Sequence, residues 1–431
     1  MSTTGFERDR GEFARGARAI VVLPDQGGAS RDADARLAET AGLAAAIGVE
    51  VVDRVHLRVR QPRPATLIGS GQAEQLAIAV RQHEAQLAVF DASLTPVQQR
   101  NLETALGAKV IDRTGLILEI FGERAATAEG RLQVELAHLD YQAGRLVRSW
   151  THLERQRGGF GFLGGPGETQ IEADRRLIRD RMAKLRRELD QVSRTRGLHR
   201  DRRQRAPWPV IALVGYTNAG KSTLFNRLTG AHVMAENLLF ATLDPTLRQI
   251  SLPGIDKAIL SDTVGFVSEL PTQLVAAFKA TLEEVVSADL LVHVRDVAHP
   301  DSEAQRADVE AVLAEIGVSE TTPRIEAWNK LDMLEGDRRA ALLADADKRR
   351  DVVAISALSG EGVDALTAAV ADRLTREHRR YTITLDAADG AGAAWLHAHG
   401  EMLSEESGEG EVTYEVRLSP ADYDRFLTRS H

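Results

Sequence analysis

Short apolar runs alternate with helix-like stretches over the first part of the chain, from about residue 17 to residue 127. In a parallel sheet each strand is followed by a helix that returns the chain, so this alternation predicts an α/β domain over residues 1–127. Four apolar runs predict strands: 19–23, 49–59, 87–90 and 109–111. Three stretches between them predict helices: 33–46, 72–83 and 96–106.

Two longer helical patterns follow, at about 116–153 and 169–196. A glycine-rich segment at 158–167 separates them, so we expect an antiparallel helical hairpin that, with its basic linker, fills residues 128–207. A connection between two helices needs only about 2–8 residues. This one carries Phe160 and Phe162, and we therefore expect the loop to contact a partner.

The rest of the chain divides into two predicted parts. Residues 208–378 again alternate apolar strands with helices, after a linker that contains Pro207 and Pro209. Residues 379–431 predict strand–helix–strand–helix with an acidic loop at 404–411, which indicates a small α+β domain.

The first strand of the third region, 210–214, precedes a segment with the pattern Gly-x4-Gly-Lys-Ser and then a helix. Glycines let backbone N–H groups face phosphate oxygens, and the helix adds the positive end of its dipole. In such a P-loop the lysine reaches the β- and γ-phosphates and the serine binds Mg²⁺. A chance glycine-rich turn would not supply strand, spacing and Lys-Ser together. Nucleotide contacts are predicted for Gly215, Tyr216, Thr217, Asn218, Ala219, Gly220, Lys221 and Ser222.

A second motif, Asp-Thr-Val-Gly, follows the apolar stretch 258–260, about 40 residues after the P-loop. An aspartate at the end of a strand can hold the Mg²⁺ shell, and a glycine beside the γ-phosphate can donate its N–H. The tetrapeptide alone is equally consistent with a plain turn, and its place after a P-loop favours the phosphate role. The candidate residues are Asp262, Thr263, Val264 and Gly265.

Two further loops carry the features of a guanine site. A carboxylate in the motif Asn-Lys-Leu-Asp can accept both N1–H and N2–H of guanine, whereas adenine offers no such pair of donors. The later segment Ser-Ala-Leu would direct a backbone N–H at the guanine oxygen. Four ordered motifs, each after an apolar strand, indicate a guanine-nucleotide domain of the Ras-like P-loop class. The candidates here are Asn329, Lys330, Asp332, Ser356, Ala357 and Leu358.

The segment between the first two motifs predicts a switch loop, which needs a threonine that closes over Mg²⁺ and the γ-phosphate. Thr242 and Thr246 both qualify by residue type. Phe266 stands where many Ras-like GTPases place a water-orienting glutamine, so we expect intrinsic hydrolysis to be slow or to use another group. Asn218 either supports a monovalent cation such as K⁺ or only caps the turn. The switch candidates are Phe240, Ala241, Thr242, Leu243 and Asp244, and the catalytic candidates are Lys221, Asn218 and Gly265.

Charge and composition narrow the function further. The chain of 431 residues has a net charge of −9, yet residues 175–205 carry 13 Lys and Arg against four Asp and Glu. Four acids cannot pair thirteen bases, so this stretch favours RNA contact over a solvated helix face. The absence of cysteine excludes disulfides, a thiol nucleophile and cysteine-ligated metals. No apolar run predicts a transmembrane helix or secretory signal, so we expect a soluble, cytoplasmic protein. We also expect a monomer.

These motifs resemble those of the HflX family of ribosome-associated P-loop GTPases. The resemblance spans about residues 17–375 and rests on segments 67–71, 116–121, 130–136, 165–170, 240–246 and 262–266. It implies docking of the N-terminal domain and hairpin on the large ribosomal subunit and its rRNA, in splitting or rescue of stalled or stressed ribosomes or in large-subunit quality control. It also implies that Thr242 is the Mg²⁺ ligand beside Ser222, and that the ribosome stimulates hydrolysis. The family often has an arginine just before Gly-Pro-Gly, whereas Phe-Leu-Gly-Gly stands at 162–165 here.

The expected fold class is therefore α/β. It comprises an N-terminal α/β domain, a long helical hairpin, a Ras-like P-loop GTPase domain and a small α+β C-terminal domain. The alternative function is a GTP-controlled switch whose hairpin engages a protein or an acidic membrane surface, since a basic stretch permits peripheral membrane contact. A metabolic P-loop kinase is disfavoured by the Asn-Lys-Leu-Asp motif at 329–332.

Overall fold

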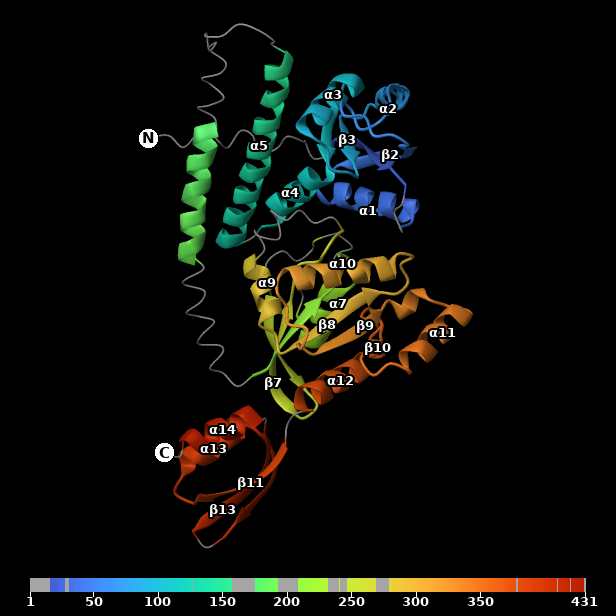
Figure 1. Ribbon diagram of the computed structural model, residues 1–431. Helices are drawn as coiled ribbons and strands as arrows, with labels where there is room; N and C mark the ends of the chain where they lie inside the picture. Colours follow the sequence, from blue (N-terminus) through green and yellow to red (C-terminus); the bar gives the residue numbers. More distant parts are fainter. Residues whose placement is uncertain are drawn as a thin grey trace.

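The computed structural model confirms the mixed α/β architecture, with an N-terminal domain, a helical region, a GTPase domain and a C-terminal domain in chain order (Figure 1). The C-terminal domain lies at the end of the molecule opposite the N-terminal domain (Figure 1). The structure describes residues 16–27, 31–125, 127–156, 175–192, 208–231, 240, 246–268, 279–376, 379–408, 410–418 and 420–429.

The N-terminal domain is a parallel four-stranded sheet with the strand order β2-β1-β3-β4. Helices α1 and α4 pack on one face of this sheet, and α2 and α3 pack on the other. The two layers of helices explain why the inner strands β1 and β3 read as nearly continuous apolar runs. The four predicted strands and three predicted helices of this domain are present, as β1 (Arg18–Asp25), α1 (Ala33–Ala46), β2 (Glu50–Arg58), α2 (Ser70–Gln82), β3 (Leu87–Phe90), α3 (Pro96–Leu106) and β4 (Lys109–Asp112). A further helix, α4 (Arg113–Arg124), follows β4 directly.

The prediction of a single long helix over 116–153 is wrong, because the chain forms two helices there. The chain forms α4, leaves the helical conformation at Ala125, and begins α5 (Ala128–Gln156) three residues later. The Thr127 hydroxyl accepts a hydrogen bond from the N–H of Gly130 (2.9 Å), as an N-cap does. The Thr127 cap therefore starts a second helix within a stretch of sequence whose helical periodicity is continuous.

A helix over 175–192 lies beside α5, as the predicted hairpin requires (Figure 1). Met182 and Leu185 are buried, and Arg181 forms an ion pair with Glu135 of α5 (2.6 Å). The glycine-rich loop 158–167 and the basic residues after 192 lie outside the described residues.

The GTPase domain has a six-stranded sheet with the order β10-β9-β8-β5-β7-β6. Only the β6–β7 pair is antiparallel, so the other five strands end at one edge of the sheet. Parallel α/β sheets bind their ligands at this carboxyl edge. The elements are β5 (Val210–Val214), α7 (Lys221–Thr229), β6 (Thr246–Leu252), β7 (Ile255–Asp262), α9 (Lys279–Val286), β8 (Leu290–Asp296), α10 (Ser302–Glu315), β9 (Arg324–Asn329), the 3₁₀ turn η2 (Leu331–Met333), α11 (Gly336–Ala346), β10 (Val352–Ala354) and α12 (Val363–Thr375).

The C-terminal domain has one strand more than predicted. The acidic segment 404–411 is not a loop throughout, because residues 404–407 lie in one strand and Glu411 begins the next. Exposed glutamates are compatible with an edge strand, where one face meets water. The elements are β11 (Arg379–Asp386), α13 (Gly390–His399), β12 (Glu401–Ser407), β13 (Glu411–Leu418) and α14 (Pro420–Arg429), with the sheet order β11-β13-β12.

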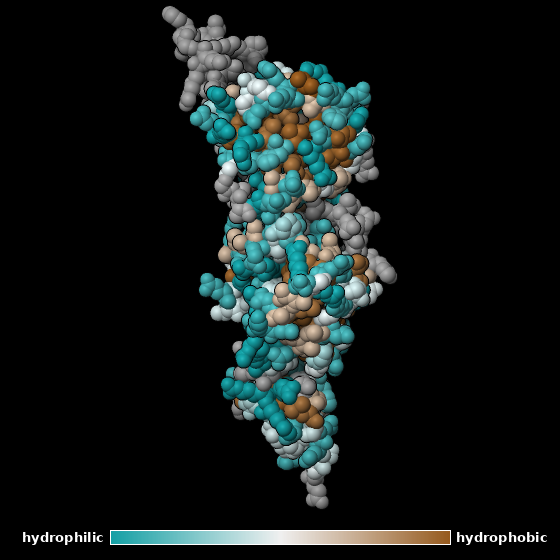
Figure 2. Space-filling model, turned by 90° about the vertical axis from the view of Figure 1, so that its right-hand side faces the viewer, coloured by the Kyte–Doolittle hydropathy of each residue, from teal (hydrophilic) through white to brown (hydrophobic). Residues whose placement is uncertain are grey.

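One hydrophobic cluster crosses from the N-terminal domain into the GTPase domain. It contains Ile117 and Phe121 of α4 together with Phe240, Val264 and Phe266 of the GTPase domain. The outer surface mixes polar and hydrophobic residues, with hydrophobic atoms most visible over the N-terminal domain at the top of Figure 2. None of the helices in the described ranges is long and apolar enough to cross a membrane.

Candidate nucleotide-binding site

The P-loop connects β5 to α7 at the carboxyl edge of the sheet. Gly220 has φ +100, and a Cβ built there would lie 2.1 Å from Asn329 Nδ2, so only glycine fits. Lys221 is buried and donates to the carbonyl oxygens of Gly215 (3.0 Å) and Tyr216 (2.8 Å). Burial lowers the pKa of Lys221 to about 8, although Asp262 opposes that shift. Burial deprives the Lys221 ammonium of hydration, and phosphate groups bound beside it would compensate for that loss.

A hydroxyl and a carboxylate meet beside the P-loop lysine. The Ser222 hydroxyl donates to Asp262 Oδ2 over 2.8 Å, which joins the start of α7 to the end of β7. Hydroxyl and carboxylate oxygens are ligands that Mg²⁺ prefers, so this pair fits a magnesium site. The other predicted ligand, Thr242, lies outside the described residues, as do Ala241, Leu243 and Asp244. Phe240 is described, and it is buried against Phe121 with ring centroids 4.7 Å apart.

The side chain of Asn329 joins the P-loop to the loop after β10. Its Nδ2 donates to the Ala219 carbonyl (2.7 Å), and its Oδ1 accepts from the Ala357 N–H (2.8 Å). In the same loops, Asp332 Oδ1 accepts from the Ser356 hydroxyl over 2.5 Å. Lys330 adopts a left-handed conformation (φ +71) and pairs with Asp296 (2.7 Å). The structure therefore brings the two predicted base-recognition loops together against the P-loop.

The segment Gly265–Phe266 lies directly on the P-loop. Phe266 N–H donates to the Gly215 carbonyl (3.1 Å), and Thr217 N–H donates to the Phe266 carbonyl (2.7 Å). A Cβ built on Gly265 would lie 2.8 Å from Thr217 Cγ2 and 3.1 Å from Lys221 Nζ, so this position also needs glycine. Asn218 is exposed and adopts a left-handed conformation (φ +58). Asparagine tolerates that conformation better than most residues.

Arg227 of α7 is a site residue that the motifs do not reveal. Its Nε donates to the Ala357 carbonyl (2.7 Å) and its Nη2 donates to the Leu358 carbonyl (2.5 Å). These bonds fix the loop expected to face the guanine oxygen. Arg227 follows Lys221 by less than two helical turns, and nothing in the sequence pattern links it to residues so far downstream.

Replacing Arg227 with methionine is expected to weaken GDP and GTP binding together, by about three- to tenfold. The reason is that the loss of hydrogen bonds worth about 1 kcal/mol leaves the Ala357–Leu358 loop less ordered. Fluorescence titration with a labelled nucleotide measures the effect. Arg248→Met is the matched control, because this exposed arginine bonds the carbonyl of its neighbour Leu247 (3.0 Å). Equal affinities in the Arg227 variant and the control would contradict the assigned role.

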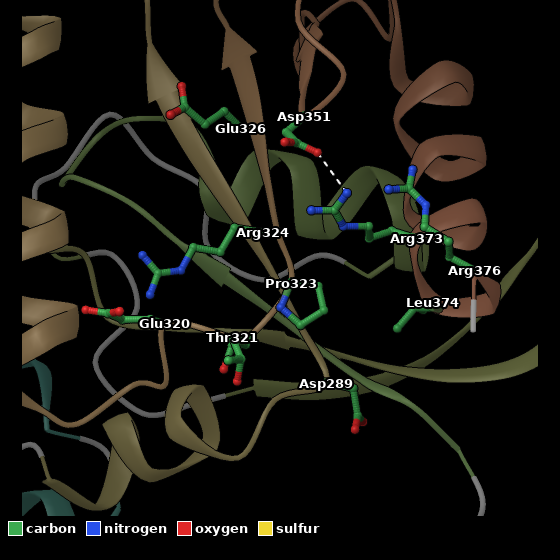
Figure 3. Close-up of a pocket in the computed structure, with 11 residues that line it drawn as sticks. Asp289, Glu320, Thr321, Pro323, Arg324, Glu326, Asp351, Arg373, Leu374 and Arg376 are labelled. Carbon is green, nitrogen blue, oxygen red and sulfur yellow. Dashed lines mark ion pairs between the residues drawn. The ribbon is translucent and has the colours of Figure 1, made fainter. Parts of the chain in front are cut away.

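A hollow of about 960 Å³ lies at the opposite, amino edge of the same sheet (Figure 3). It is bordered by Asp289, Arg324 and Asp351, at or just before the starts of β8, β9 and β10, and by Arg373 and Arg376 near the end of α12. Arg373 and Asp351 form an ion pair there (2.9 Å). None of the predicted nucleotide residues lines this hollow, so it is distinct from the phosphate and base loops.

His293 lies in the core of the GTPase domain. It is buried in β8, and burial lowers the pKa of its imidazole. No cluster of potential metal-ligating His, Asp or Glu residues occurs within the described part of the chain.

The sheet order and the four motifs at its carboxyl edge define a P-loop GTPase of the Ras-like class. Four family models match consecutive parts of the chain. They are described as GTP-binding GTPase N-terminal (residues 34–122), GTP-binding GTPase middle region (124–203), 50S ribosome-binding GTPase (210–330) and HflX C-terminal domain (341–429).

Two relatives match at least 90% of the chain. GTPase HflX of Magnetococcus marinus is 51% identical over 405 residues, which is 94% of this chain and 93% of the relative. GTPase HflX of Escherichia coli is 45% identical over 392 residues, 90% of this chain and 91% of the relative. The chain belongs to the HflX family of GTPases. The crystal structure of a GTP-binding protein from Sulfolobus solfataricus in complex with GDP is 25% identical, with a TM-score of 0.45 over 84% of this chain and 99% of that one.

Proposed function

We propose that this GTPase acts on the large ribosomal subunit in the cytoplasm, as a monomer that splits or rescues stalled or stressed ribosomes or monitors large-subunit quality. The observation that carries the proposal is the helix over 175–192. Its buried residues Met182 and Leu185 lie on one side, while Arg176, Arg179 and Arg186 are exposed. Exposed arginines at helical spacing can neutralise RNA phosphates and release counterions. The match of residues 210–330 to a ribosome-binding GTPase model supports the same partner.

The nucleotide site would supply the switch for this action. We infer that Lys221 holds the β- and γ-phosphates, that Asp332 accepts from guanine, and that the Gly265 N–H faces the γ-phosphate. Ser222 and Thr242 would hold Mg²⁺, which neutralises charge on the phosphates when bound. Asn218 would help to place a K⁺ ion against the phosphates. GTP would favour the ribosome-bound state, and hydrolysis would favour release.

We infer that the group that orients the attacking water comes from the partner and not from residue 266. Phe266 has no polar group and is fully buried, so it cannot align water as a glutamine does. A ribosome-stimulated reaction follows if rRNA or a ribosomal protein supplies or orders the missing group. The need for an external group is better explained by a GTPase that the ribosome stimulates than by one that hydrolyses GTP unaided.

Co-sedimentation with purified ribosomes and separated subunits tests the proposal. GDP, GTP, ATP and a non-hydrolysable GTP analogue are compared at two salt concentrations. We expect the analogue to drive the protein onto the large subunit, with weaker binding at high salt. The triple change Arg176→Gln, Arg179→Gln and Arg186→Gln should weaken binding, whereas Lys348→Gln on an exposed turn after α11 should not. Loss of intact ribosomes in the same gradient would support splitting.

The absence of any nucleotide-dependent pelleting at low salt would overturn the ribosomal proposal. Flotation with anionic vesicles then tests the alternative of a membrane-bound switch, since the same arginines would attract acidic lipid headgroups. Neither outcome affects the assignment of GTP hydrolysis, which rests on the family and on the P-loop fold.

A further inference from the structure

The side chain of Tyr216 points out of the P-loop toward the N-terminal domain. Its hydroxyl lies 2.9 Å from Glu39 Oε2, on α1, and accepts a hydrogen bond from the Ser268 N–H (2.9 Å). Ser268 follows Gly265 by three residues, so one phenol joins both phosphate-facing loops to the neighbouring domain. Burial, and after it Glu39, raises the pKa of Tyr216 to about 12, so the phenol stays protonated and donates to the carboxylate.

Arg113, the first residue of α4, contacts the same serine from the other side. Its Nη2 donates to Ser268 Oγ (2.9 Å) and its Nε donates to the Ser268 carbonyl (3.3 Å). The guanidinium also pairs with Glu39 and with Asp91 at the end of β3. We call Glu39, Arg113, Tyr216 and Ser268 the Tyr216 cluster.

In the Tyr216 cluster, Arg113 and Tyr216 are buried, Glu39 and Ser268 are partly buried, and the charges of Arg113 and Glu39 balance. The side chain of Arg113 is only 5% exposed, and Asp91, which it shares with Arg36, is fully buried. Although burial opposes its charge, Glu39 and Asp91 raise the pKa of Arg113, so it stays ionised. Breaking a buried pair of this kind is costly because the remaining charge loses its partner. The contact therefore holds Ser268 in one place.

Helix α4 contacts the nucleotide loops at a second point. Phe121 packs edge-to-face on Phe240, which immediately precedes the predicted switch threonine segment. Phe266 belongs to the same hydrophobic cluster as Phe121 and Ile117. The two nucleotide-sensing segments of the GTPase domain thus both rest on one helix of the N-terminal domain.

We propose that Glu39 and Arg113 set the preference of the site between GDP and GTP, because they act through Tyr216 and Ser268 to hold the segment 265–268 against the P-loop. In this arrangement Gly265 lies on Thr217 and close to the Lys221 ammonium. A γ-phosphate has to fit between that ammonium and the Gly265 N–H. The Tyr216 cluster consequently favours GDP over GTP, because separating the two loops strains or breaks its hydrogen bonds.

The test is the ratio of two affinities in the full-length protein, for a non-hydrolysable GTP analogue and for GDP. Tyr216→Phe removes only the hydroxyl and keeps the ring. We expect it to raise the affinity for the analogue relative to GDP by about three- to tenfold, the equivalent of roughly one hydrogen bond. Ser268→Ala should shift the ratio in the same direction. Glu39→Gln with Tyr216→Phe should be non-additive, because the two groups share one hydrogen bond.

Tyr141→Phe is the matched control. Tyr141 of α5 is also a largely buried tyrosine bonded to a carboxylate of the N-terminal domain, Asp112 (2.6 Å), but it has no hydrogen bond to the described residues of the nucleotide loops. The ratio should stay at the wild-type value in this variant. An unchanged or lowered ratio in Tyr216→Phe, an equal shift in Tyr141→Phe, or a parallel loss of affinity for both nucleotides would overturn the proposal. Thermal unfolding confirms that each variant folds, and no ribosome is needed, so failure of the proposed function leaves this test intact.

Discussion

Replacing Asp332 with asparagine is expected to weaken GTP and GDP binding by about 10²- to 10⁴-fold, since each of two hydrogen bonds to a charged acceptor contributes about 1.5–3 kcal/mol. A carboxylate accepts from N1–H and N2–H of guanine, whereas an amide offers one oxygen and a competing N–H. The Ser356 hydroxyl already donates to Asp332 Oδ1 (2.5 Å). In the variant that oxygen remains with Ser356, and the new NH₂ group faces the guanine donors.

The same change should create affinity for xanthosine nucleotides. Xanthine carries a carbonyl oxygen where guanine carries its 2-amino group, so the amide N–H gains an acceptor. Fluorescence competition with GDP, XDP and ADP measures the exchange of specificity. Asp337→Asn removes the same charge from an exposed residue at the start of α11 and should leave GDP affinity unchanged. A loss of less than tenfold in the Asp332 variant, or a gain of ADP binding, would show that another group recognises the base.

Much of this arrangement is predictable because parallel strands and nucleotide motifs have local signals. The parallel strands that carry the motifs contain apolar runs, and each motif begins at or just after the end of its strand, so topology alone collects Lys221, Asp262 and Asn329 at one edge. The errors arise where local chemistry competes with a longer pattern. Thr127 caps a new helix within a helical periodicity, and the glutamates of β12 are compatible with an edge strand that composition alone assigns to a loop.

The contacts between domains have no comparable signal. Glu39, Arg113 and Ser268 are far apart in the chain, and each is of a residue type that is common on surfaces. Tyr216 was predicted as a nucleotide contact by its place in the P-loop, yet its side chain leaves the site and bonds Glu39. Hydrophobic periodicity predicts which face of a single helix or strand is buried. The contacts among these residues depend instead on how two folded domains pack. The sequence therefore predicts the phosphate loops but not what restrains them.

Replacing Phe266 with glutamine tests how the packing between the two domains affects stability and GTP hydrolysis. This change introduces the residue that many Ras-like GTPases use to orient water, yet we expect no increase in GTP hydrolysis. We expect the free energy of unfolding to fall by about 3–5 kcal/mol, since a large core side chain is lost and an amide is buried. Phe266 is fully buried in the cluster that contains Ile117 and Phe121, so its side chain is directed into the domain junction and away from solvent. Urea unfolding and single-turnover hydrolysis measure the two effects.

Phe266→Leu separates packing from polarity. It keeps an apolar side chain and should cost less than the glutamine variant, by roughly the penalty of burying an unbonded amide, about 1–3 kcal/mol. A glutamine variant that hydrolyses GTP tenfold faster at unchanged stability would place this side chain at the nucleotide and contradict the structure. If instead both variants lose stability without gaining activity, residue 266 holds α4 against the segment 265–268. The group that orients water must then come from elsewhere, as the proposed stimulation by the ribosome requires.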